Sequence, residues 1–258
     1  MSRIFELLQR LEQQNETEQE GLIQPPKDPY ASWTATDGSP SSSGPKASAL
    51  QFGSAARDAV GKLVQQLFFV EHPPRVVVFS ALERKAGCTF LAARTAEILA
   101  EQCNGSVCLV DGNIRCPALH AIFTIDNGRG LRDVIERSDP SRSCAKRLPD
   151  RNLWVLTSGQ TCNGEYVIQS NTIRNWIRQI RTEFTYIVVD SPPLTLCNDT
   201  LGLAASSEGI VLVLKANSSR RETAQNTLQD LRRANIRLLG AILNQRTFPV
   251  PEAIYKRL

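Results

Sequence analysis

The chain has 258 residues, of which 41% are hydrophobic. This is enough for one sizeable α/β domain with its own core and an additional tail. Thirty basic and twenty-six acidic residues give a formal net charge of +4. Because this charge is small and no dense basic block is present, the composition gives no support to nucleic-acid binding.

The cysteines and the N-terminus bear on the compartment. The seven cysteines are an odd number, lie scattered and form no C-x-x-C pair, which favours a reducing cytoplasm. The first residues lack the apolar core of a signal peptide, and no apolar run approaches the roughly 18 residues of a membrane span. We therefore expect a cytoplasmic protein that reaches a membrane only through a partner.

The first fifty residues differ in pattern from the rest. Apolar residues at helical spacing predict a short amphipathic helix over residues 1–18, which is either a docking element or a marginal, frayed helix. Residues 19–50 are rich in Pro, Ser and Gly and lose this periodicity, so we interpret them as a flexible linker. The third unit, residues 51–258, carries the regular elements.

Strands and helices alternate along this third unit. We expect strands over residues 75–79, 107–110, 153–156, 186–189, 209–215 and 237–243, and helices over 55–69, 90–102, 173–184 and 222–235. Several strands are continuously apolar, as the strands of a parallel sheet are. The alternation predicts a doubly wound, mostly parallel α/β sheet with helices on both faces.

Polar residues stand where these strands end. Asp111 follows the strand at 107–110, Asp190 follows that at 186–189, and Asn244 follows that at 237–243. In a doubly wound sheet, ligands bind beyond the carboxyl ends of the strands. Each aspartate could instead cap the loop or helix after it. Because both lie at the edge where the first strand also ends, we favour an Mg²⁺-phosphate site.

The loop after the first strand, residues 80–89, lies where a phosphate-binding loop is found. Such a loop reads G-x-x-x-x-G-K-[ST], in which backbone amides and a helix N-terminus hold phosphate and the hydroxyl ligates Mg²⁺. Gly87 and Thr89 fit this pattern, but Leu82 takes the first glycine position and Cys88 the lysine position. The frame of a nucleotide-binding loop is therefore present, and its chemistry is altered.

Two longer motifs resemble those of a known family. The segment V-C-L-V-D-G-N-I-R-C-P at 107–117 is similar to an apolar strand followed by D-x-D-x-R-x-P, and Y-I-V-V-D-S-P-P at 186–193 to a strand followed by D-[ST]-P-P. The chain thereby resembles the bacterial tyrosine autokinases of exopolysaccharide and capsule synthesis, a branch of the MinD/ParA-type P-loop ATPases, from about residue 55 to the end.

This resemblance implies ATP and Mg²⁺ as cofactors and assigns roles to residues. Thr89 and Asp111 would hold Mg²⁺, Asp190 would act with Asp111 in catalysis, and Asn244 would contact the adenine base. Gly87, Cys88 and Lys85 would lie against the phosphates. The family also implies an inner-membrane chain-length or export protein as partner, and oligomers of the chain with itself.

The departures from the family bear on activity. Cys88 replaces the lysine that neutralises the transferred phosphate, Lys85 stands where the family has glycine, and Asn113 replaces the second acid of its motif. Tyr255 alone stands where the family has a C-terminal tyrosine cluster. Near the first helix, Asp58, Gly61 and Val64 replace the family's E-x-x-R-x-x-R contact motif.

These departures favour a tyrosine-autokinase-like protein that is weakened or inactive in phosphoryl transfer and regulates a membrane partner. Two alternatives stay open. The protein is an active autokinase if Lys85 or Arg84 supplies the missing charge and Tyr255 accepts phosphate. It is a positioning ATPase of the MinD/ParA type if it lacks kinase activity but dimerises with nucleotide.

Overall fold

The protein is described here by a computed structural model, in which residues 53–149, 151–160 and 169–245 are described. The expected helix over 1–18, the linker over 19–50 and Tyr255 lie outside these residues. Within them, no helix is both long enough and apolar enough to cross a bilayer.

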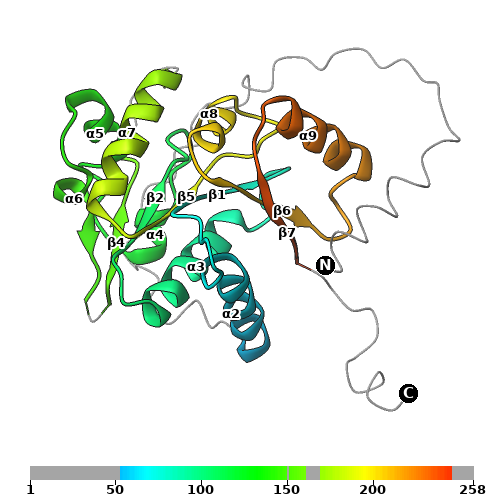
Figure 1. The fold of residues 1–258 in the computed structure, drawn as a ribbon, viewed down its shortest axis with the longest axis horizontal. Coiled ribbons are helices and arrows are strands. Elements are labelled where there is room, and N and C mark those ends of the chain that lie inside the picture. The colour runs from blue at the N-terminus through cyan, green and yellow to red at the C-terminus, as the bar shows by residue number, and fades with distance from the viewer. Residues whose placement is uncertain (1–52, 150, 161–168, 246–258) are drawn as a thin grey trace, which may run out of the picture. The chain divides into compact units, whose positions relative to one another are not determined.

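The domain is built on one sheet of seven strands (Figure 1). Their order is β3-β4-β2-β5-β1-β6-β7, and every pair is parallel except β3 with β4. The strands are β1 (Val76–Ala81), β2 (Val107–Asp111), β3 (Lys146–Arg147), β4 (Leu153–Leu156), β5 (Tyr186–Asp190), β6 (Gly209–Lys215) and β7 (Leu238–Asn244). The expected doubly wound, mostly parallel α/β fold is confirmed.

Helices cover both faces of the sheet (Figure 1). One face packs against α2 (Ser54–Phe68), α3 (Cys88–Gln102) and α4 (Leu119–Phe123). The other packs against α5 (Leu131–Arg137), α6 (Ser141–Cys144), α7 (Ser170–Glu183), α8 (Asp199–Ala205) and α9 (Arg221–Arg233). Because both faces are covered, β1, β2 and β5 are buried almost throughout, which explains why these strands read as continuous apolar runs.

Alternate side chains of strand β1 pack into the two hydrophobic clusters on opposite faces of the sheet. Val77 and Phe79 enter the cluster with α2 and α3, whereas Val76 and Val78 enter the cluster with α7 and α8. This division follows from the alternation of side chains along a strand. Burial of these four apolar side chains holds β1 in the centre of the sheet. It thereby also positions the start of the loop that follows β1.

Several described elements were not predicted from the sequence, among them α6, β3 and α8. The polar stretch before Pro149 contains α6 and the short strand β3, and the stretch after Pro193 contains α8. Helix α6 has four residues and β3 has two, which is too short for a periodic pattern to show. Helix α8 has seven residues, of which two are small alanines, so the helical periodicity of its apolar residues is weak.

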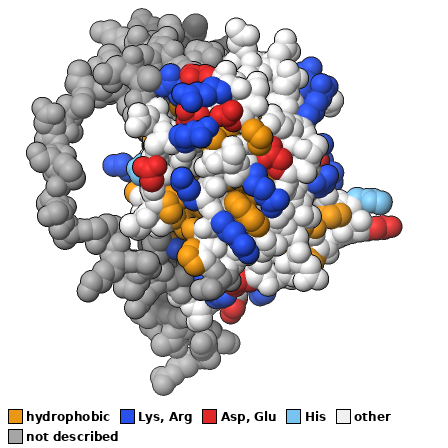
Figure 2. All heavy atoms as spheres, turned by 90° about the vertical axis from the view of Figure 1, so that its left-hand side faces the viewer, with side chains coloured by type: hydrophobic (Ala, Val, Ile, Leu, Met, Phe, Trp, Pro, Cys, Tyr) orange, Lys and Arg blue, Asp and Glu red, His pale blue; other side chains and the backbone are white. Residues whose placement is uncertain are grey.

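The edge of the sheet at β3 is charged. Lys146 and Arg147 form the whole strand and are exposed. The guanidinium groups of Arg142 and Arg147 lie over the ring of Trp154 at 4.6 and 5.2 Å from its centroid. Figure 2 views this side of the molecule and shows Lys and Arg side chains with hydrophobic ones between them. A short, charged strand opposes edge-to-edge pairing with another chain.

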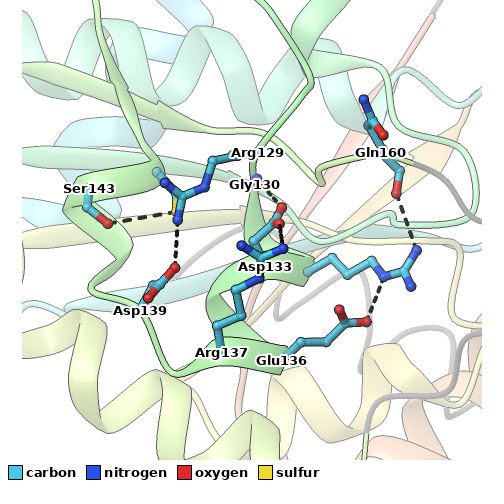
Figure 3. Close-up of polar contacts among 10 residues, drawn as sticks. Arg129, Gly130, Asp133, Glu136, Arg137, Asp139, Ser143 and Gln160 are labelled. Atoms are coloured by element: carbon cyan, nitrogen blue, oxygen red, sulfur yellow. Dashed lines mark hydrogen bonds and ion pairs between the residues drawn. The ribbon is translucent and has the colours of Figure 1, made fainter.

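Helix α5 is docked on the end of β4 through its first turn, where Asp133 reaches back to Gly130 (Figure 3). The amides of Leu131 and Arg132 donate to the carbonyls of Thr157 and Ser158 at 2.7 and 3.0 Å. The Asp133 carboxylate accepts from the amide of Gly130 at 2.9 Å. A Cβ atom on Gly130 would lie 2.2 Å from the backbone of the 157–159 segment, so this approach requires glycine.

Replacement of Gly130 therefore tests how closely α5 is held. We expect Gly130→Ala to lower the free energy of unfolding by at least about 2 kcal/mol, because the new methyl group meets backbone that cannot rotate away. Gly61→Ala on α2 is the matched control. Nothing lies within 4 Å of its added Cβ, so we expect a gain of about 0.5–1 kcal/mol from helix propensity. Equal urea midpoints for the two variants would contradict the close docking.

Candidate functional site

The predicted site residues meet at the carboxyl-terminal edge of the sheet. Strand β5 lies between β1 and β2, and the Cα atoms of Asp111 and Asp190 are direct partners in the β2–β5 register. The loop after β1 crosses the same edge. The two aspartates are therefore neighbours, as their positions at strand ends predict.

The loop between β1 and α3 presents the N-terminus of a helix. Helix α3 begins at Cys88, and Gly87 before it has φ of 84°. In the described part of the chain, the amides of Gly87, Cys88 and Thr89 donate to no protein atom. Free amides at a helix N-terminus carry partial positive charge and suit an anion such as phosphate.

Lys85 adopts the backbone conformation that its glycine counterpart would adopt freely. Its φ is 61°, in the left-handed region, where a residue with a Cβ atom pays about 1–2 kcal/mol. The loop thus retains the shape of a phosphate-binding loop, although its sequence does not favour that shape. The Lys85 side chain is exposed.

Asp111 serves as a cap. Its Oδ2 accepts from the amides of Ala118 and Leu119, both at 3.0 Å, and its Oδ1 accepts from the amide of Asn113 at 3.2 Å. Burial raises the pKa of Asp111 to about 6, against the opposing effect of these three amides. The capping role weighed in the sequence analysis is therefore present. It does not exclude a ligand role, since each carboxylate oxygen has further acceptor capacity.

Asp190 has no comparable set of partners. It is 1% exposed, and its Oδ1 accepts no hydrogen bond from the described residues. Burial and then the neighbouring charge of Asp111 raise the pKa of Asp190 to about 8, although the side chains of Thr89 and Cys88 beside it favour the charged form. A buried, unpartnered carboxylate oxygen next to a second carboxylate is an arrangement that a divalent cation would stabilise.

Cys88 faces this carboxylate. Burial, followed by the charge of Asp190 and a contact with it, raises the pKa of the Cys88 thiol well above its usual range. The thiol is therefore protonated at neutral pH, and the helix N-terminus does not make it a reactive thiolate. The position that holds a cationic ammonium in a working loop holds a neutral donor here.

The D-S-P-P segment after β5 fixes the loop and the aspartates to each other. The hydroxyl of Ser191 donates to the carbonyl of Phe79 at 2.9 Å, and that of Ser80 donates to the carbonyl of Pro192 at 2.7 Å. The amide of Leu194 donates to the carbonyl of Ala81 at 2.9 Å. These bonds give the Ser191 hydroxyl a structural role directly after the aspartate.

Several contacts of the loop were missed in the sequence analysis. Asn244 Nδ2 donates to the carbonyl of Ala86 at 2.8 Å, and Gln245 Nε2 donates to that of Lys85 at 2.9 Å. The hydroxyls of Ser218 and Ser219 donate to the Glu83 carboxylate at 2.9 and 2.6 Å. Only Asn244 carried a sequence signal, because the others lie in turns whose pairing depends on the tertiary fold.

The residues at this edge fit the cofactor that the sequence implies, with one exception. Thr89, Asp111 and Asp190 bring together a hydroxyl and two carboxylates, which are oxygen ligands of the kind that Mg²⁺ takes. The free amides at the start of α3 suit phosphate. The exception is Cys88, which supplies no positive charge.

Comparisons with known proteins agree with the expected resemblance. A scan against models of protein families found no match. Among curated proteins, the chain is 27% identical over 176 residues to a tyrosine-protein kinase CapB described as putative in Staphylococcus aureus, covering 68% of this chain and 77% of that protein. It is 27% identical over 162 residues to the tyrosine-protein kinase YwqD of Bacillus subtilis, covering 61% and 67%.

The chain is a homologue of bacterial tyrosine kinases.

Solved structures of other proteins resemble the fold of this homologue of bacterial tyrosine kinases. The chimerical protein CapA2B2 superposes with a TM-score of 0.69 at 20% identity, over 77% of this chain and 88% of the other. The septum site-determining protein MinD of Pyrococcus horikoshii, complexed with Mg-ADP, superposes with a TM-score of 0.56 at 22% identity, over 70% and 76%. The expected MinD-like P-loop fold is thereby confirmed.

The strain at Lys85 gives a stability prediction. We expect Lys85→Gly to raise the free energy of unfolding by about 0.5–1 kcal/mol. Glycine adopts positive φ without the Cβ penalty, and its greater conformational freedom in the unfolded chain offsets part of this gain. Urea unfolding followed by circular dichroism measures this. Lys85→Ala is the matched control and keeps the Cβ atom, so a similar gain for alanine would show that the side chain and not the backbone is responsible.

The aspartate pair gives a pH prediction in buffer without divalent cations. Since the pKa of Asp190 is raised from the ordinary aspartate value of about 4 to about 8, the folded protein binds more protons than the unfolded chain between these values. Its unfolding free energy therefore falls as the pH rises from about 4 to about 8.

Asp190→Asn should reduce this slope and, at pH 8.5, raise the free energy of unfolding by about 1–3 kcal/mol, because it removes a buried charge. Asp58→Asn on the exposed surface of α2 is the control and should leave the slope unchanged. Denaturant unfolding across this pH range is the measurement, and parallel curves for Asp190→Asn and the parent would refute the assignment.

Proposed function

We propose that this protein is a tyrosine-autokinase-like P-loop protein of exopolysaccharide or capsular polysaccharide synthesis or export. It works in the cytoplasm and is weakened or inactive in phosphoryl transfer. It acts as the regulatory partner of an inner-membrane chain-length or export protein. The similarity to bacterial tyrosine kinases supports the first part, and the altered loop supports the second.

The observation that carries the proposal is the neutral group at the lysine position. Phosphoryl transfer depends on positive charge placed against the phosphate. In this chain the position faces Asp190 with a protonated thiol. The carboxylates of Asp111 and Asp190 remain beside it, so the metal-binding part of the site is kept and the charge that would bind the transferred phosphate is absent.

The remaining residues would still hold a nucleotide weakly. The amides of Gly87, Cys88 and Thr89 would bind phosphate oxygens, and the hydroxyl of Thr89 with the carboxylate of Asp111 would hold Mg²⁺. When bound, Mg²⁺ would neutralise charge on the phosphates. Asp190 would then be a carboxylate instead of an acid, because a nearby cation lowers the pKa that burial has raised.

An active kinase is the second candidate. It is favoured by the similarity to the tyrosine-protein kinase YwqD and to CapB, which is described as a putative tyrosine-protein kinase. Arg84 and Lys85, both exposed and three to four residues before Cys88, would supply the charge, and Tyr255 would accept the phosphate. Autophosphorylation on tyrosine in Mg-ATP that is lost in Asp111→Asn would select this candidate over the first.

The affinity for ATP tests the proposal directly. We expect weak binding of Mg-ATP to the natural protein and at least about tenfold tighter binding to Cys88→Lys, since one charge-assisted contact contributes about 1.4 kcal/mol or more. Isothermal titration calorimetry with and without Mg²⁺ measures both. Cys88→Met is the control, because it has a side chain of similar length without the charge.

Two results would count against the proposal. Submicromolar Mg-ATP binding by the natural protein would show that the lysine is not needed. A gain that is equal in Cys88→Met and Cys88→Lys would show that side-chain length or the loss of the thiol, and not charge, limits binding.

A further inference from the structure

The phosphate-binding loop is held from outside by two segments that follow β6 and β7. Asn244 and Gln245, at the end of β7, donate to the carbonyls of Ala86 and Lys85. The turn after β6 reaches the loop two residues earlier, at Glu83. Three positions of the loop, Glu83, Lys85 and Ala86, are thus tied to residues at the ends of β6 and β7.

Asn244 lies directly against the loop. Besides its bond of 2.8 Å to the carbonyl of Ala86, its Nδ2 atom would lie 2.4 Å from a Cβ atom placed on Gly87. The amide of Asn244 therefore packs over the bare backbone of Gly87. This contact requires glycine at position 87 in addition to the positive φ found there.

The two outer segments are themselves joined. Lys215 and Asn244 are partners in the β6–β7 register, and the amide of Ala216 donates to the carbonyl of Asn244 at 2.9 Å. The hydroxyl of Ser219 accepts from the amide of Lys215 at 2.8 Å and donates to the Glu83 carboxylate. The loop is therefore attached to one continuous framework and not to independent side chains.

The loop needs such support because its own sequence does not favour its shape. Lys85 has φ of 61°, a conformation that costs less for glycine. The amides of Gly87, Cys88 and Thr89 point at an anion only while the segment before them stays in this conformation. Residues that bond the carbonyls of Lys85 and Ala86 keep those amides in place without touching a ligand.

We propose that Asn244 and Gln245 are positioning residues for anion binding, holding the phosphate loop in its binding conformation. Asn244 acts on ligand affinity through the loop and not through contact with a nucleobase, the role expected from sequence. This inference rests on the proposed function only in taking phosphate as the ligand of the loop.

Hydrogen exchange without any ligand tests the first part of the proposal, that Asn244 and Gln245 hold the loop. Variants are compared with the natural protein. We expect Asn244→Ala to speed amide exchange across residues 82–90 by tenfold or more, and Gln245→Ala to do so by a smaller factor. Asn226→Ala, at an exposed position of α9, is the control and should leave these rates unchanged. If Asn244→Ala unfolds, the exposed Gln245 still provides the test. Unchanged exchange in the folded variants would overturn the proposal.

Ligand affinity tests the second half. Inorganic tripolyphosphate and ATP, each with Mg²⁺, are titrated into the natural protein, the Cys88→Lys protein, and each of these carrying Asn244→Ala. A positioning role predicts that Asn244→Ala weakens both ligands by the same factor, since the effect passes through the loop. A loss confined to ATP would show a base contact and overturn the proposal.

The two tests separate this inference from the function on which it rests. If neither the natural nor the Cys88→Lys protein binds either ligand, the nucleotide site proposed above fails. The exchange rates of residues 82–90 still decide whether Asn244 and Gln245 hold the loop.

Discussion

The close approach of two buried carboxylates at one edge of the sheet is the constraint on which the site depends. Asp111 and Asp190 are register partners on adjacent strands, and both are fully or almost fully buried. Two such charges cannot be held together without protons, hydrogen bonds or a cation. Asp111 meets this requirement with three backbone amides. Asp190 does not, and its pKa is raised accordingly.

The Asp190 carboxylate in turn influences the protonation of the Cys88 thiol. In a loop with lysine at this position, a carboxylate nearby would have a cation to pair with. Here it has a thiol whose own pKa is raised by burial and then by the charge of Asp190, so both groups favour their protonated forms when no cation is bound. With Cys88 at the lysine position of the motif, the pair that this residue forms with Asp190 is neutral when no cation is bound.

The sequence was sufficient to predict the elements that carry periodic or continuous apolar patterns. The strands that end at Asp111 and Asp190, the loop before α3 and the helices α3 and α7 were predicted close to their observed bounds. The carboxyl-end rule for parallel sheets then predicted that the aspartates and the loop would meet. That rule needs only the order of strands and helices, which the sequence contains.

The elements and contacts that were not predicted depend on distant parts of the chain. Helix α6 is too short for a pattern, and its amides at Ser141 and Arg142 are capped by Glu183 from α7, 41 or 42 residues away. The bond between Ser219 and Glu83 joins residues 136 positions apart, and neither residue type signals the other. Whether Asp111 caps a helix or binds a ligand was also undecided, because both roles use the same oxygens.

The conformation of Lys85 shows that the fold, and not the loop sequence, determines the shape of this site. A lysine at a position of positive φ loses about 1–2 kcal/mol relative to a relaxed backbone. The bonds from Gln245, Asn244 and the two serines each contribute an amount of that order, so together they can offset the strain. The hydrogen bonds to Glu83, Lys85 and Ala86 therefore set the conformation of the loop, although Lys85 itself does not favour it.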